Sequence, residues 1–432
     1  MKKYDSYKDS GVEWIGKVPA NWGISKVKFL FDTQKGKTPK NLLDKIEENS
    51  LVYLAMDYLR GEPKQVFFVS NNENVVLTEE NETLLLWDGS NAGEFLKSKK
   101  GVLSSTMALI KSKIIDNQFQ WYSFKSFESI LKDSCNGMGI PHVDGKFFRG
   151  SAFLVPPIEE QQAIVNYLDQ KTTQIDNLIT KKEQFIKLLE EERVAVINQA
   201  VTKGLDPNVS MKDSGIEWLG EIPKHWKVNK IKSVTNKIGS GVTPKGGAEI
   251  YELTGIPLLR SQNVYFDGFR LDNVAYITRE IHDSMKNSQV LFGDVLLNIT
   301  GGSIGRCYYV TNEFEEANVN QHVCIVRPNE RIITEFLYYV LSSTLGQQQI
   351  DLCQTGGNRE ALNFEQLKNF FLILPSIDEQ HEIVEKLNKS LNAISLTIEK
   401  SRKEIDLINE YKTALISEVV TGKVDVRNEK LN

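Results

Sequence analysis

Pro156-Pro157-Ile158-Glu159-Glu160-Gln161-Gln162 opens the stretch that decides the fold, because this stretch occurs twice in the chain. The first copy ends at Gly204, and the second runs from Pro375-Ser376-Ile377-Asp378-Glu379-Gln380 to Lys423. The copies align without a gap at an offset of 219 residues. A proline followed by acidic residues, with a glycine just past the end, is typical of helix boundaries. The sequence therefore predicts two related long helices.

Apolar residues in both copies recur in steps of three and four, the spacing of a coiled-coil seam. These seam residues are Val165, Leu168, Ile175, Ile179, Ile186, Leu189, Val196, Val384, Leu387, Leu391, Ile394, Ile398, Ile405, Ile408 and Leu415. Polar interruptions coincide as well, with Lys182 matching Ser401 and Arg193 matching Lys412. Two helices that packed separately on unrelated cores would have no reason to carry polar residues at the same seam positions. We therefore expect the two helices to pack on each other.

A second repeat precedes each of two more variable segments. Lys8-Asp9-Ser10-Gly11-Val12-Glu13-Trp14-Ile15-Gly16 is matched by Lys212-Asp213-Ser214-Gly215-Ile216-Glu217-Trp218-Leu219-Gly220, and Pro19 and Trp22 recur as Pro223 and Trp226. The repeated tryptophans are expected to be buried anchors rather than groups that stack on nucleic-acid bases. If they contacted bases, the two halves of the chain would recognise the same bases.

The variable segments, 24–155 and 228–374, mix short β-type runs with turn signals. The expected strands are 50–55, 65–69, 83–87, 255–260, 294–299 and 322–326, and a helix is expected near 332–345. Each segment is interpreted as an α/β domain on a curved sheet. The expected boundaries are 1–155 and 205–374 for repeat plus domain, 156–204 and 375–425 for the helices, and 426–432 for a tail.

The short connections between these parts constrain their geometry. Domain two follows the end of helix one closely, and helix two follows domain two closely, so helix two must begin near the end of helix one. The predicted fold is mixed α/β: two tandem α/β domains, each followed by a long helix, the helices pairing as an antiparallel coiled coil. Each helix would span roughly 60 Å at 1.5 Å per residue.

Composition excludes several classes of protein. Apolar content of 41% and charged content of 25% are ordinary for a soluble domain, and no apolar run approaches the length of a membrane span. The four cysteines lie far apart and form no CxxC pair, which favours a reducing cytoplasm over a disulfide or zinc framework. The net charge of −5 argues against a protein that binds nucleic acid through an overall positive charge.

Sequence motifs for catalysis or metal binding are incomplete. Gly36-Lys37-Thr38 resembles the end of a P-loop, but Phe31 stands where its first glycine would be. No Asn-Pro-Pro-aromatic run suggests adenine flipping, and the five histidines lack ligand spacing. We therefore assign no catalytic residue and no metal ligand, although a triad assembled in space would escape this search.

Polar, glycine-rich loops between the strands are the candidate contact elements. Arg, Asn and Gln can read base edges, and Lys, Ser and Thr suit phosphates, although any single loop could be a solvated turn. The candidate DNA-binding residues are Lys35, Lys37, Thr38, Lys40, Ser90, Asn91, His142, Ser240, Thr243, Lys245, Arg260, Gln262, Asn263, Ser303, Arg306, Asn320, Gln321, Asn358 and Arg359.

The doubled order of these motifs resembles the specificity (S) subunit of a type I restriction–modification system. The resemblance covers essentially the whole chain and rests on the two repeats, on Gly241-Val242-Thr243-Pro244, on Asn298-Ile299-Thr300-Gly301 and on Gly356-Gly357-Asn358-Arg359. The second helix departs from the family pattern at Ser376 and at Gly422-Lys423. Neither departure changes the implied role.

The resemblance implies two target-recognition domains that each read half of a split, asymmetric sequence in double-stranded DNA. It implies that the helix pair fixes the unread gap, and two readers on one side of a duplex favour half-sites about 34–36 Å apart. It further implies two methyltransferase (M) subunits that modify adenine N6, and motor-nuclease (R) subunits in the full complex. S-adenosylmethionine, ATP and magnesium would be bound by those other subunits, so no cofactor is expected on this chain, which would be cytoplasmic and non-catalytic.

Two rival interpretations stay open from sequence alone. A self-contained modification enzyme would need the motifs that are missing here. A coiled-coil scaffold that binds no DNA would explain the charge, because segment 24–155 holds 17 basic and 16 acidic residues and segment 228–374 holds 13 and 15. Under the specificity-subunit interpretation, we expect the methyltransferase partners to supply much of the phosphate contact, which dominates affinity for DNA.

Overall fold

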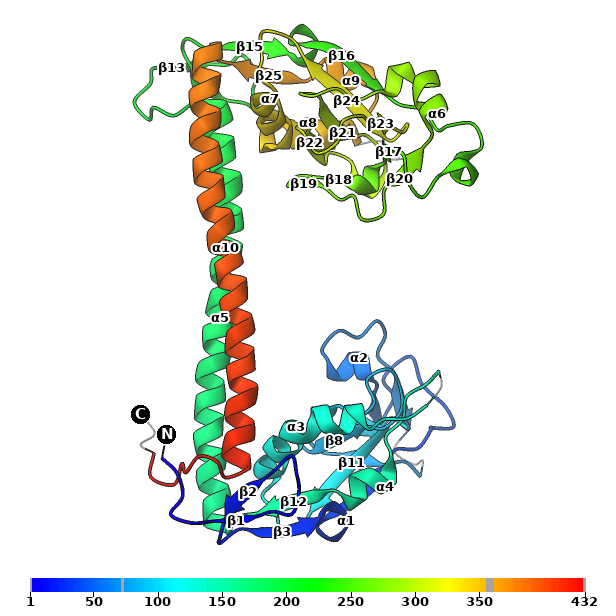
Figure 1. Ribbon diagram of the computed structural model, residues 1–432, viewed down its shortest axis with the longest axis vertical. Coiled ribbons are helices and arrows are strands. Elements are labelled where there is room, and N and C mark those ends of the chain that lie inside the picture. The colour runs from blue at the N-terminus through cyan, green and yellow to red at the C-terminus, as the bar shows by residue number, and fades with distance from the viewer. Residues whose placement is uncertain (1, 71–73, 138, 355–360, 430–432) are drawn as a thin grey trace. The chain divides into compact units, whose positions relative to one another are not determined.

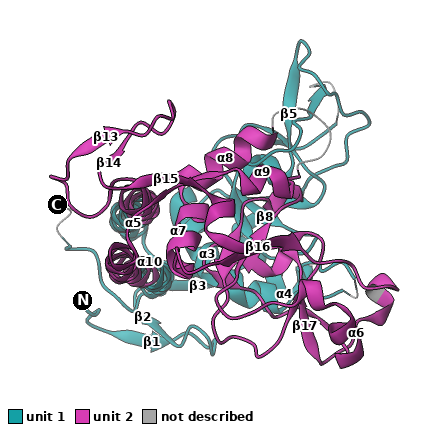
Figure 2. Cartoon of the chain, turned by 90° about the horizontal axis from the view of Figure 1, so that it is seen from above, with its two compact units in different colours: residues 1–182, 402–432 teal, residues 183–401 magenta. Residues whose placement is uncertain are grey.

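The computed structural model describes residues 2–70, 74–137, 139–354 and 361–429. The chain divides into two units, residues 1–182 with 402–432 and residues 183–401 (Figure 2). Each unit therefore contains one α/β domain together with part of each long helix, α5 (Ile158–Lys203) and α10 (Ile377–Val420) (Figure 1).

Unit 1 is built on two four-stranded sheets rather than the single curved sheet that the sequence suggested. One has the order β6-β5-β10-β7 with a parallel β5–β10 pair, and the other has the antiparallel order β4-β11-β8-β9. The elements are β1 (Tyr7–Asp9), β2 (Lys17–Pro19), β3 (Gly23–Lys26), α1 (Val27–Leu30), β4 (Phe31–Lys35), β5 (Ser50–Leu54), α2 (Met56–Leu59), β6 (Phe68–Ser70), β7 (Leu77–Thr78), β8 (Thr83–Leu86), β9 (Phe95–Lys97), β10 (Gly101–Leu103), β11 (Met107–Ser112), α3 (Asn117–Asp133), α4 (Gly145–Gly150) and β12 (Ala152–Val155).

Unit 2 repeats this arrangement. The antiparallel sheet has the order β16-β24-β21-β22, and a second sheet has the order β20-β17-β23 with a parallel β17–β23 pair. The elements are β13 (Met211–Asp213), β14 (Glu221–Pro223), β15 (Lys227–Lys230), β16 (Thr235–Ser240), β17 (Ile256–Leu259), β18 (Val264–Tyr265), β19 (Gly268–Phe269), β20 (Ala275–Ile277), α6 (Arg279–Ser284), β21 (Val295–Asn298), β22 (Cys307–Tyr309), β23 (Asn318–Val319), β24 (Val323–Pro328), α7 (Thr334–Ser342), α8 (Thr344–Gln354), α9 (Phe364–Lys368) and β25 (Phe371–Leu374).

The two sheets of each unit are joined where one strand is interrupted. In unit 1 the chain leaves β10, turns at Ser104–Thr106 and continues as β11, and the Ser104 hydroxyl lies 3.0 Å from that of Thr106. In unit 2 the same break falls at Asn320–His322, between β23 and β24. The expected helix near 332–345 is present as α7, and a further helix, α8, follows it directly after Ser343. The mixed α/β fold class with two tandem domains and long helices is confirmed, whereas the single sheet is wrong.

The two long helices pack antiparallel within each unit. In unit 1, Ile164 and Leu168 near the start of α5 share a core with Leu415 and Val419 near the end of α10. In unit 2, Val201 near the end of α5 shares a core with Ile383 and Leu387 near the start of α10, so the direction is the same in both units. None of the fifteen predicted seam residues is exposed, and Leu168, Leu387 and Leu415 are almost completely buried.

Polar breaks in the seam are occupied by ion pairs in unit 1. Lys412 Nζ lies 2.6 Å from an Asp176 carboxylate oxygen, and Lys182 forms an ion pair with Glu404. These pairs are partly exposed, so each contributes at most about 1 kcal/mol to stability. They favour one register of the helices more than they strengthen the pairing.

A buried tryptophan holds the helix ends together in each unit. The Trp22 indole N–H donates to Glu160 Oε1 over 2.9 Å, and the Trp226 indole N–H donates to Glu379 Oε1 over 2.9 Å. Both indoles are fully buried. Gly422, just past the end of α10, lies so close to Trp22 that a Cβ would come within 3.2 Å of the ring, and Gly204 lies equally close to Trp226. Each indole therefore contacts the start of one long helix and the end of the other.

The other repeated tryptophans, Trp14 and Trp218, are not buried anchors as the sequence suggested. Their exposed fractions are 38% and 43%, because each sits on a turn that both units build in the same way. Ser10 N–H donates to the Gly16 carbonyl and Ser214 N–H donates to the Gly220 carbonyl, each over 3.0 Å. The repeat therefore supplies one buried and one exposed indole to each unit.

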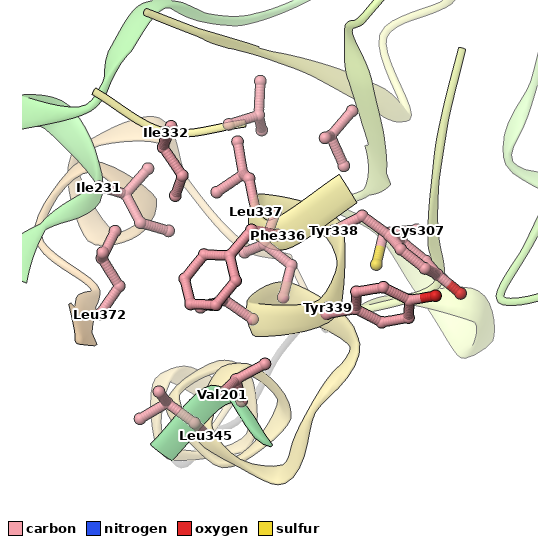
Figure 3. Packing of buried hydrophobic residues seen from close by; sticks show 14 of the residues in the cluster. Val201, Ile231, Cys307, Ile332, Phe336, Leu337, Tyr338, Tyr339, Leu345 and Leu372 are labelled. Carbon is pink, nitrogen blue, oxygen red and sulfur yellow. The ribbon is translucent and has the colours of Figure 1, made fainter. Parts of the chain in front are cut away.

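The large core of unit 2 contains residues of α5, α10 and the antiparallel sheet. Figure 3 shows the part of it around α7. Helix α7 carries Phe336 and Leu337, both fully buried, toward a cluster that includes Val201 of α5 and Leu372 of β25. Burial without a hydrogen-bond partner raises the pKa of the Cys307 thiol far above its ordinary value. This thiol is therefore a packing group rather than a reactive one.

The repeated glutamine at each helix start joins helix and domain. The Gln161 side-chain amide donates to the Pro156 carbonyl and its oxygen accepts from the Asp116 backbone N–H, both over 2.9 Å. Gln380 likewise donates to the Pro375 carbonyl over 3.2 Å and accepts from the Ile333 backbone N–H over 2.9 Å. The conserved spacing of the two copies is thus explained by contacts made twice.

Replacing Gln161 by alanine should destabilise unit 1, because a buried N–H and a buried carbonyl would lose their partners at a cost of about 1–3 kcal/mol. The neighbouring Gln162 is exposed and bonds only Asn166 on its own helix. Gln162→Ala is therefore the matched control and should change stability by less than about 0.5 kcal/mol. Urea unfolding followed by fluorescence measures both, and equal midpoints for the two variants would contradict the assignment.

Candidate nucleic-acid interface

Three predicted loops of unit 1 come together beside the antiparallel sheet. Lys35 Nζ, at the end of β4, lies 2.7 Å from an Asp88 carboxylate oxygen in the β8–β9 loop. Gly89 N–H donates to the Pro141 carbonyl over 2.9 Å, and Asp88 pairs with His142 in an isolated β-bridge. The sequence separated these loops by up to a hundred residues, whereas the fold makes them neighbours.

Every predicted contact residue of unit 1 has an exposed side chain. These residues are Lys35, Lys37, Thr38, Lys40, Ser90, Asn91 and His142. Lys37 Nζ donates to the Asn74 side-chain oxygen over 3.0 Å, which fixes its position on the surface. The loop cluster thus presents cations, hydroxyls and amides together, a set that can contact both phosphates and base edges.

Four predicted loops of unit 2 are joined in a similar way. Gly241 N–H donates to the Asn320 carbonyl and Asn320 N–H donates to the Leu259 carbonyl, both over 3.1 Å. The Asn298 side chain donates to the Ser261 carbonyl over 2.8 Å and to the Ser303 hydroxyl over 3.2 Å. The loops that follow β16, β17, β21 and β23 therefore form one cluster.

A polar chain of side chains crosses the surface of this unit 2 cluster. Thr243 donates to the Gln321 side-chain oxygen, and Gln321 Nε2 lies 3.0 Å from His322 Nε2. The other ring nitrogen of His322 lies 2.7 Å from the Thr300 hydroxyl. His322 therefore links two loops by polar contact.

The predicted contact residues of unit 2 are not equally accessible. Thr243, Lys245, Gln262 and Gln321 are exposed, and Ser240, Arg260, Ser303 and Arg306 are half-buried. Asn358 and Arg359 lie outside the described residues. The four exposed side chains are the best placed of this set to reach a ligand directly.

Two predicted contact residues have structural work instead. Asn263 is buried; its side-chain oxygen accepts from the Arg260 backbone N–H over 3.0 Å, and its amide donates to the Arg270 carbonyl over 2.7 Å. Asn320 is also buried, and its side-chain oxygen accepts from the His322 backbone N–H over 3.0 Å. In this conformation both amides build loops and do not face solvent, which differs from the expected contact role.

Three arginines of unit 2 lie over tyrosine rings, and these tyrosines are not among the predicted contact residues. The guanidinium of Arg306 lies 4.6 Å and that of Arg270 lies 4.9 Å from the centre of the Tyr265 ring, while Arg260 lies 5.7 Å from that of Tyr251. Tyr265 and Arg270 lie on either side of the β18–β19 turn, whose two central residues are Phe266 and Asp267. The Arg270 guanidinium also forms an ion pair with Asp267 of the same turn over 2.8 Å, so its charge is largely balanced within the hairpin.

One glycine in each unit sets how closely a candidate loop approaches the interrupted strand. A Cβ on Gly36 would lie 2.1 Å from the Ser104 carbonyl oxygen, and a Cβ on Gly241 would lie 1.7 Å from that of Val319. Both glycines begin a Gly-x-Thr-Pro-Lys sequence, 36–40 and 241–245. Because the two units share this loop, its Thr and Lys side chains suit sequence-independent contacts better than base reading.

Within the described ranges, no group of three or more histidine, cysteine or acidic residues is arranged to hold a metal ion. The same part of the chain contains no helix long and apolar enough to cross a membrane. The predicted contact residues carry amide, hydroxyl, imidazole, guanidinium and ammonium groups.

Two tandem α/β units with loop clusters and paired long helices define a class of DNA-reading subunit. The type I restriction modification DNA specificity domain model matches residues 19–188 and 223–407, so the chain belongs to this family of specificity subunits, whose role is the recognition of DNA sequence.

A full-length relative supports the family assignment. The type I restriction enzyme MjaVIII specificity subunit of Methanocaldococcus jannaschii is 33% identical over 419 residues, which cover 95% of each chain. Two solved structures share the fold. One, from a study of complex assembly and conformational transition of the type I R-M system, has a TM-score of 0.70 at 14% identity and covers 94% of this chain and 99% of its own. The HsdS subunit of Thermoanaerobacter tengcongensis has a TM-score of 0.53 at 15% identity, covering 94% and 98%.

Asn91 and Gln262 provide a test of which loops read DNA, because both are exposed amides in different units. Asn91→Ala should relax recognition of one half-site only, and Gln262→Ala should relax the other, each by about 1–3 kcal/mol at the affected position. Methylation or binding of duplex libraries varied in one half-site at a time measures the effect. If either single substitution removed the base preference in both half-sites, the assignment of one half-site to each unit would be wrong.

Lys40→Ala is the control for this test. Its lysine belongs to the loop shared by both units, so its loss should weaken binding about equally on all sequences. A change of base preference on Lys40→Ala would show that the shared loop reads bases.

Proposed function

We propose that this chain reads a bipartite, asymmetric sequence in double-stranded DNA and positions adenine-N6 methyltransferase and endonuclease subunits on it. Each unit would read one half-site through its loop cluster, and the helix pair would fix the unread gap. The observation that carries the proposal is that both units build the same framework, down to the Trp22–Glu160 and Trp226–Glu379 hydrogen bonds, around loops that differ.

The differing loops are the support for an asymmetric target. Asp88-Gly89-Ser90-Asn91 of unit 1 occupies the topological place that Thr300-Gly301-Gly302-Ser303 occupies in unit 2. Ser104–Thr106 similarly takes the place of Asn320–His322 at the strand break. Different donors and acceptors at equivalent places would select different base pairs.

The shared surface points to a partner that is present twice. Trp14 and Trp218 are exposed, adjoin Glu13 and Glu217, and sit on turns with the same hydrogen bonds. Exposed tryptophans are common anchors of protein interfaces. We infer that each turn contacts one of two methyltransferase subunits, since a feature shared by both halves suits two identical partners.

The outer faces of the helices offer a second apolar surface. Phe185, Leu188 and Leu396 of unit 2 are exposed although they lie on regular helix, and Leu178, Leu407 and Tyr411 of unit 1 are exposed as well. Apolar side chains outside the seam support a helical partner of the same complex. Motor-nuclease subunits would join this assembly in the complete restriction enzyme.

The chemistry of the complex would reside in the other subunits. S-adenosylmethionine would serve the methyltransferase subunits, and ATP and magnesium the motor-nuclease subunits, while this chain would select the site and remain non-catalytic. We propose a cytoplasmic location for the complex, in keeping with four cysteines that are all free thiols.

Genome-wide mapping of methylated adenine tests the proposed function. The chain is co-expressed with its methyltransferase in a host without adenine methylation, and N6-methyladenine is located by long-read sequencing. A split, asymmetric motif with one fixed gap is the expected result. An assembled complex that methylates a continuous or palindromic motif would contradict two independent readers, and an assembled complex without methylation would favour a scaffold that reads no DNA.

The exposed tryptophans give a test of the partner's stoichiometry. Trp14→Glu and Trp218→Glu should each reduce the number of bound methyltransferase subunits from two to one, and the double variant to none, because a charge would replace the anchor. Mass photometry at fixed subunit concentration counts the bound copies. Phe292→Glu, at an exposed position away from the repeats, is the control and should leave two copies bound. If the double variant still bound two methyltransferase subunits, the tryptophans would not be part of the interface.

A further inference from the structure

Two short helices of unit 1, α1 and α4, enclose an open groove that none of the predicted contact residues lines. The Val27 backbone N–H at the start of α1 donates to the Ser151 carbonyl just after α4 over 3.0 Å, which holds the helices side by side. The groove, called here the α1–α4 groove, is lined by Lys28, Asp144, Gly145, Lys146, Arg149 and Gly150.

Positive charge dominates the α1–α4 groove. Lys28, Lys146 and Arg149 are all exposed, and none of them forms an ion pair with another residue in the described part of the chain. The one carboxylate, Asp144, accepts hydrogen bonds from the backbone N–H groups of Lys146 and Phe147 over 2.8 and 3.1 Å. These bonds lower the pKa of the Asp144 carboxyl, so its role is to cap the start of α4.

Two exposed aromatic side chains lie on α1 and α4, outside the lining of the groove. Lys28 Nζ lies 4.7 Å from the centre of the Phe29 ring, which is 71% exposed. Phe147, on α4, is 40% exposed and stacks on the Phe127 ring with centroids 6.2 Å apart. Phe29 and Phe147 follow the lining residues Lys28 and Lys146 on the two helices, so exposed apolar atoms lie next to the charged groove.

The groove is directly connected to the loop cluster of unit 1. The segment 136–142 leads through Val143 into α4, and the Val143 backbone N–H donates to the Trp87 carbonyl over 2.9 Å. Gly145 lies so close to Trp87 that a Cβ there would come within 3.1 Å of the ring. A duplex whose bases face the loops after β8 and α3 would therefore have its backbone near α4.

The corresponding place in unit 2 has a different charge. Lys232 takes the place of Lys28, while α9 carries Glu365 and Lys368, which pair with each other over 2.6 Å. Ser233 and Gln366 stand at the positions of Phe29 and Phe147. Unit 2 thus has two cations, one of them neutralised by a salt bridge, and no aromatic residues at these positions.

We propose that the α1–α4 groove of unit 1 binds the sugar–phosphate backbone of DNA beside the half-site that unit 1 reads. This inference rests on the proposed function. It adds that the two units differ in how they hold the DNA backbone, because only unit 1 would have this binding groove. Lys28, Lys146 and Arg149 hold phosphate oxygens, and Phe29 and Phe147 pack against the deoxyribose. The groove gives a chain of net charge −5 a local concentration of positive charge, and phosphate contacts dominate affinity for DNA.

An acidic protein surface is the other ligand that three cations could attract. DNA is favoured because the groove continues the loop cluster through Val143 and Trp87, and because the groove differs between units. A partner present in two identical copies would be expected to meet the same surface twice.

The test compares the salt dependence of DNA binding by the complex of this chain with its methyltransferase. The first variant is Lys28→Ala/Lys146→Ala/Arg149→Ala, and the matched control is Lys232→Ala/Lys368→Ala in unit 2. Fluorescence anisotropy is recorded between about 50 and 200 mM salt on a target duplex and on a random duplex. Each lost phosphate contact should reduce the slope of log K against log salt by about 0.9.

The expected result is a slope reduced by about 2–3 for the unit 1 variant on both duplexes and by less than about 1 for the control. If the complex assembles and the slope of log K against log salt is unchanged, the groove is not a DNA site. If the variant no longer binds the methyltransferase, the groove is a site for a protein partner instead. Lys28→Gln/Lys146→Gln/Arg149→Gln repeats the measurement should the alanine variant not fold. A wild-type complex that does not prefer its target duplex would instead contradict the proposed function.

Discussion

The contact on which the rest of the molecule depends is the hydrogen bond from a buried indole to the glutamate at the start of a long helix. It is made by Trp22 with Glu160 and again by Trp226 with Glu379. A bond to a charged acceptor contributes about 1.5–3 kcal/mol, and here it also satisfies a carboxylate close to the core. Because each indole packs on the glycine that ends the other helix, one side chain fixes where a domain joins both helices. In each unit, the same indole therefore holds the two antiparallel helices together and attaches the domain to them.

The sequence was most informative where a physical requirement is repeated. The two helices, their seam and their antiparallel direction follow from apolar spacing and short connections, and Leu168, Leu387 and Leu415 are buried as that spacing requires. The interruption of a strand at Ser104–Thr106 could not be predicted, because a run of β-forming residues looks alike whether it serves one sheet or two. Helix α8 was also missed, since Ser343 interrupts a segment that reads as one helix.

The candidate surface was predictable in composition but not in arrangement. Glycine-rich loops with amides and cations were recognisable from sequence, and the fold gathers them at the breaks between sheets. What sequence could not distinguish is an amide that faces solvent from one that builds a loop, as Gln262 and Asn263 illustrate at adjacent positions. The burial of Asn263 depends on the Arg270 carbonyl, which the hairpin formed by β18 and β19 brings back to it from seven residues further along the chain. The cations of α1 and α4 were overlooked because they are spread over 120 residues of an electrically balanced segment.

The close approach of Gly36 to the Ser104 carbonyl, and of Gly241 to that of Val319, has a consequence for how such a protein changes over time. At both places the backbone leaves no room for even one methyl group. An alanine there would displace a surface loop by the width of an atom while leaving the indole contacts and the helix seam intact. Because the crowding atoms belong to the backbone at the strand break, the loop itself would have to move, and its side chains would be presented in a shifted frame. Single-atom crowding at a strand break is thus a route by which a new target preference can arise without loss of the scaffold.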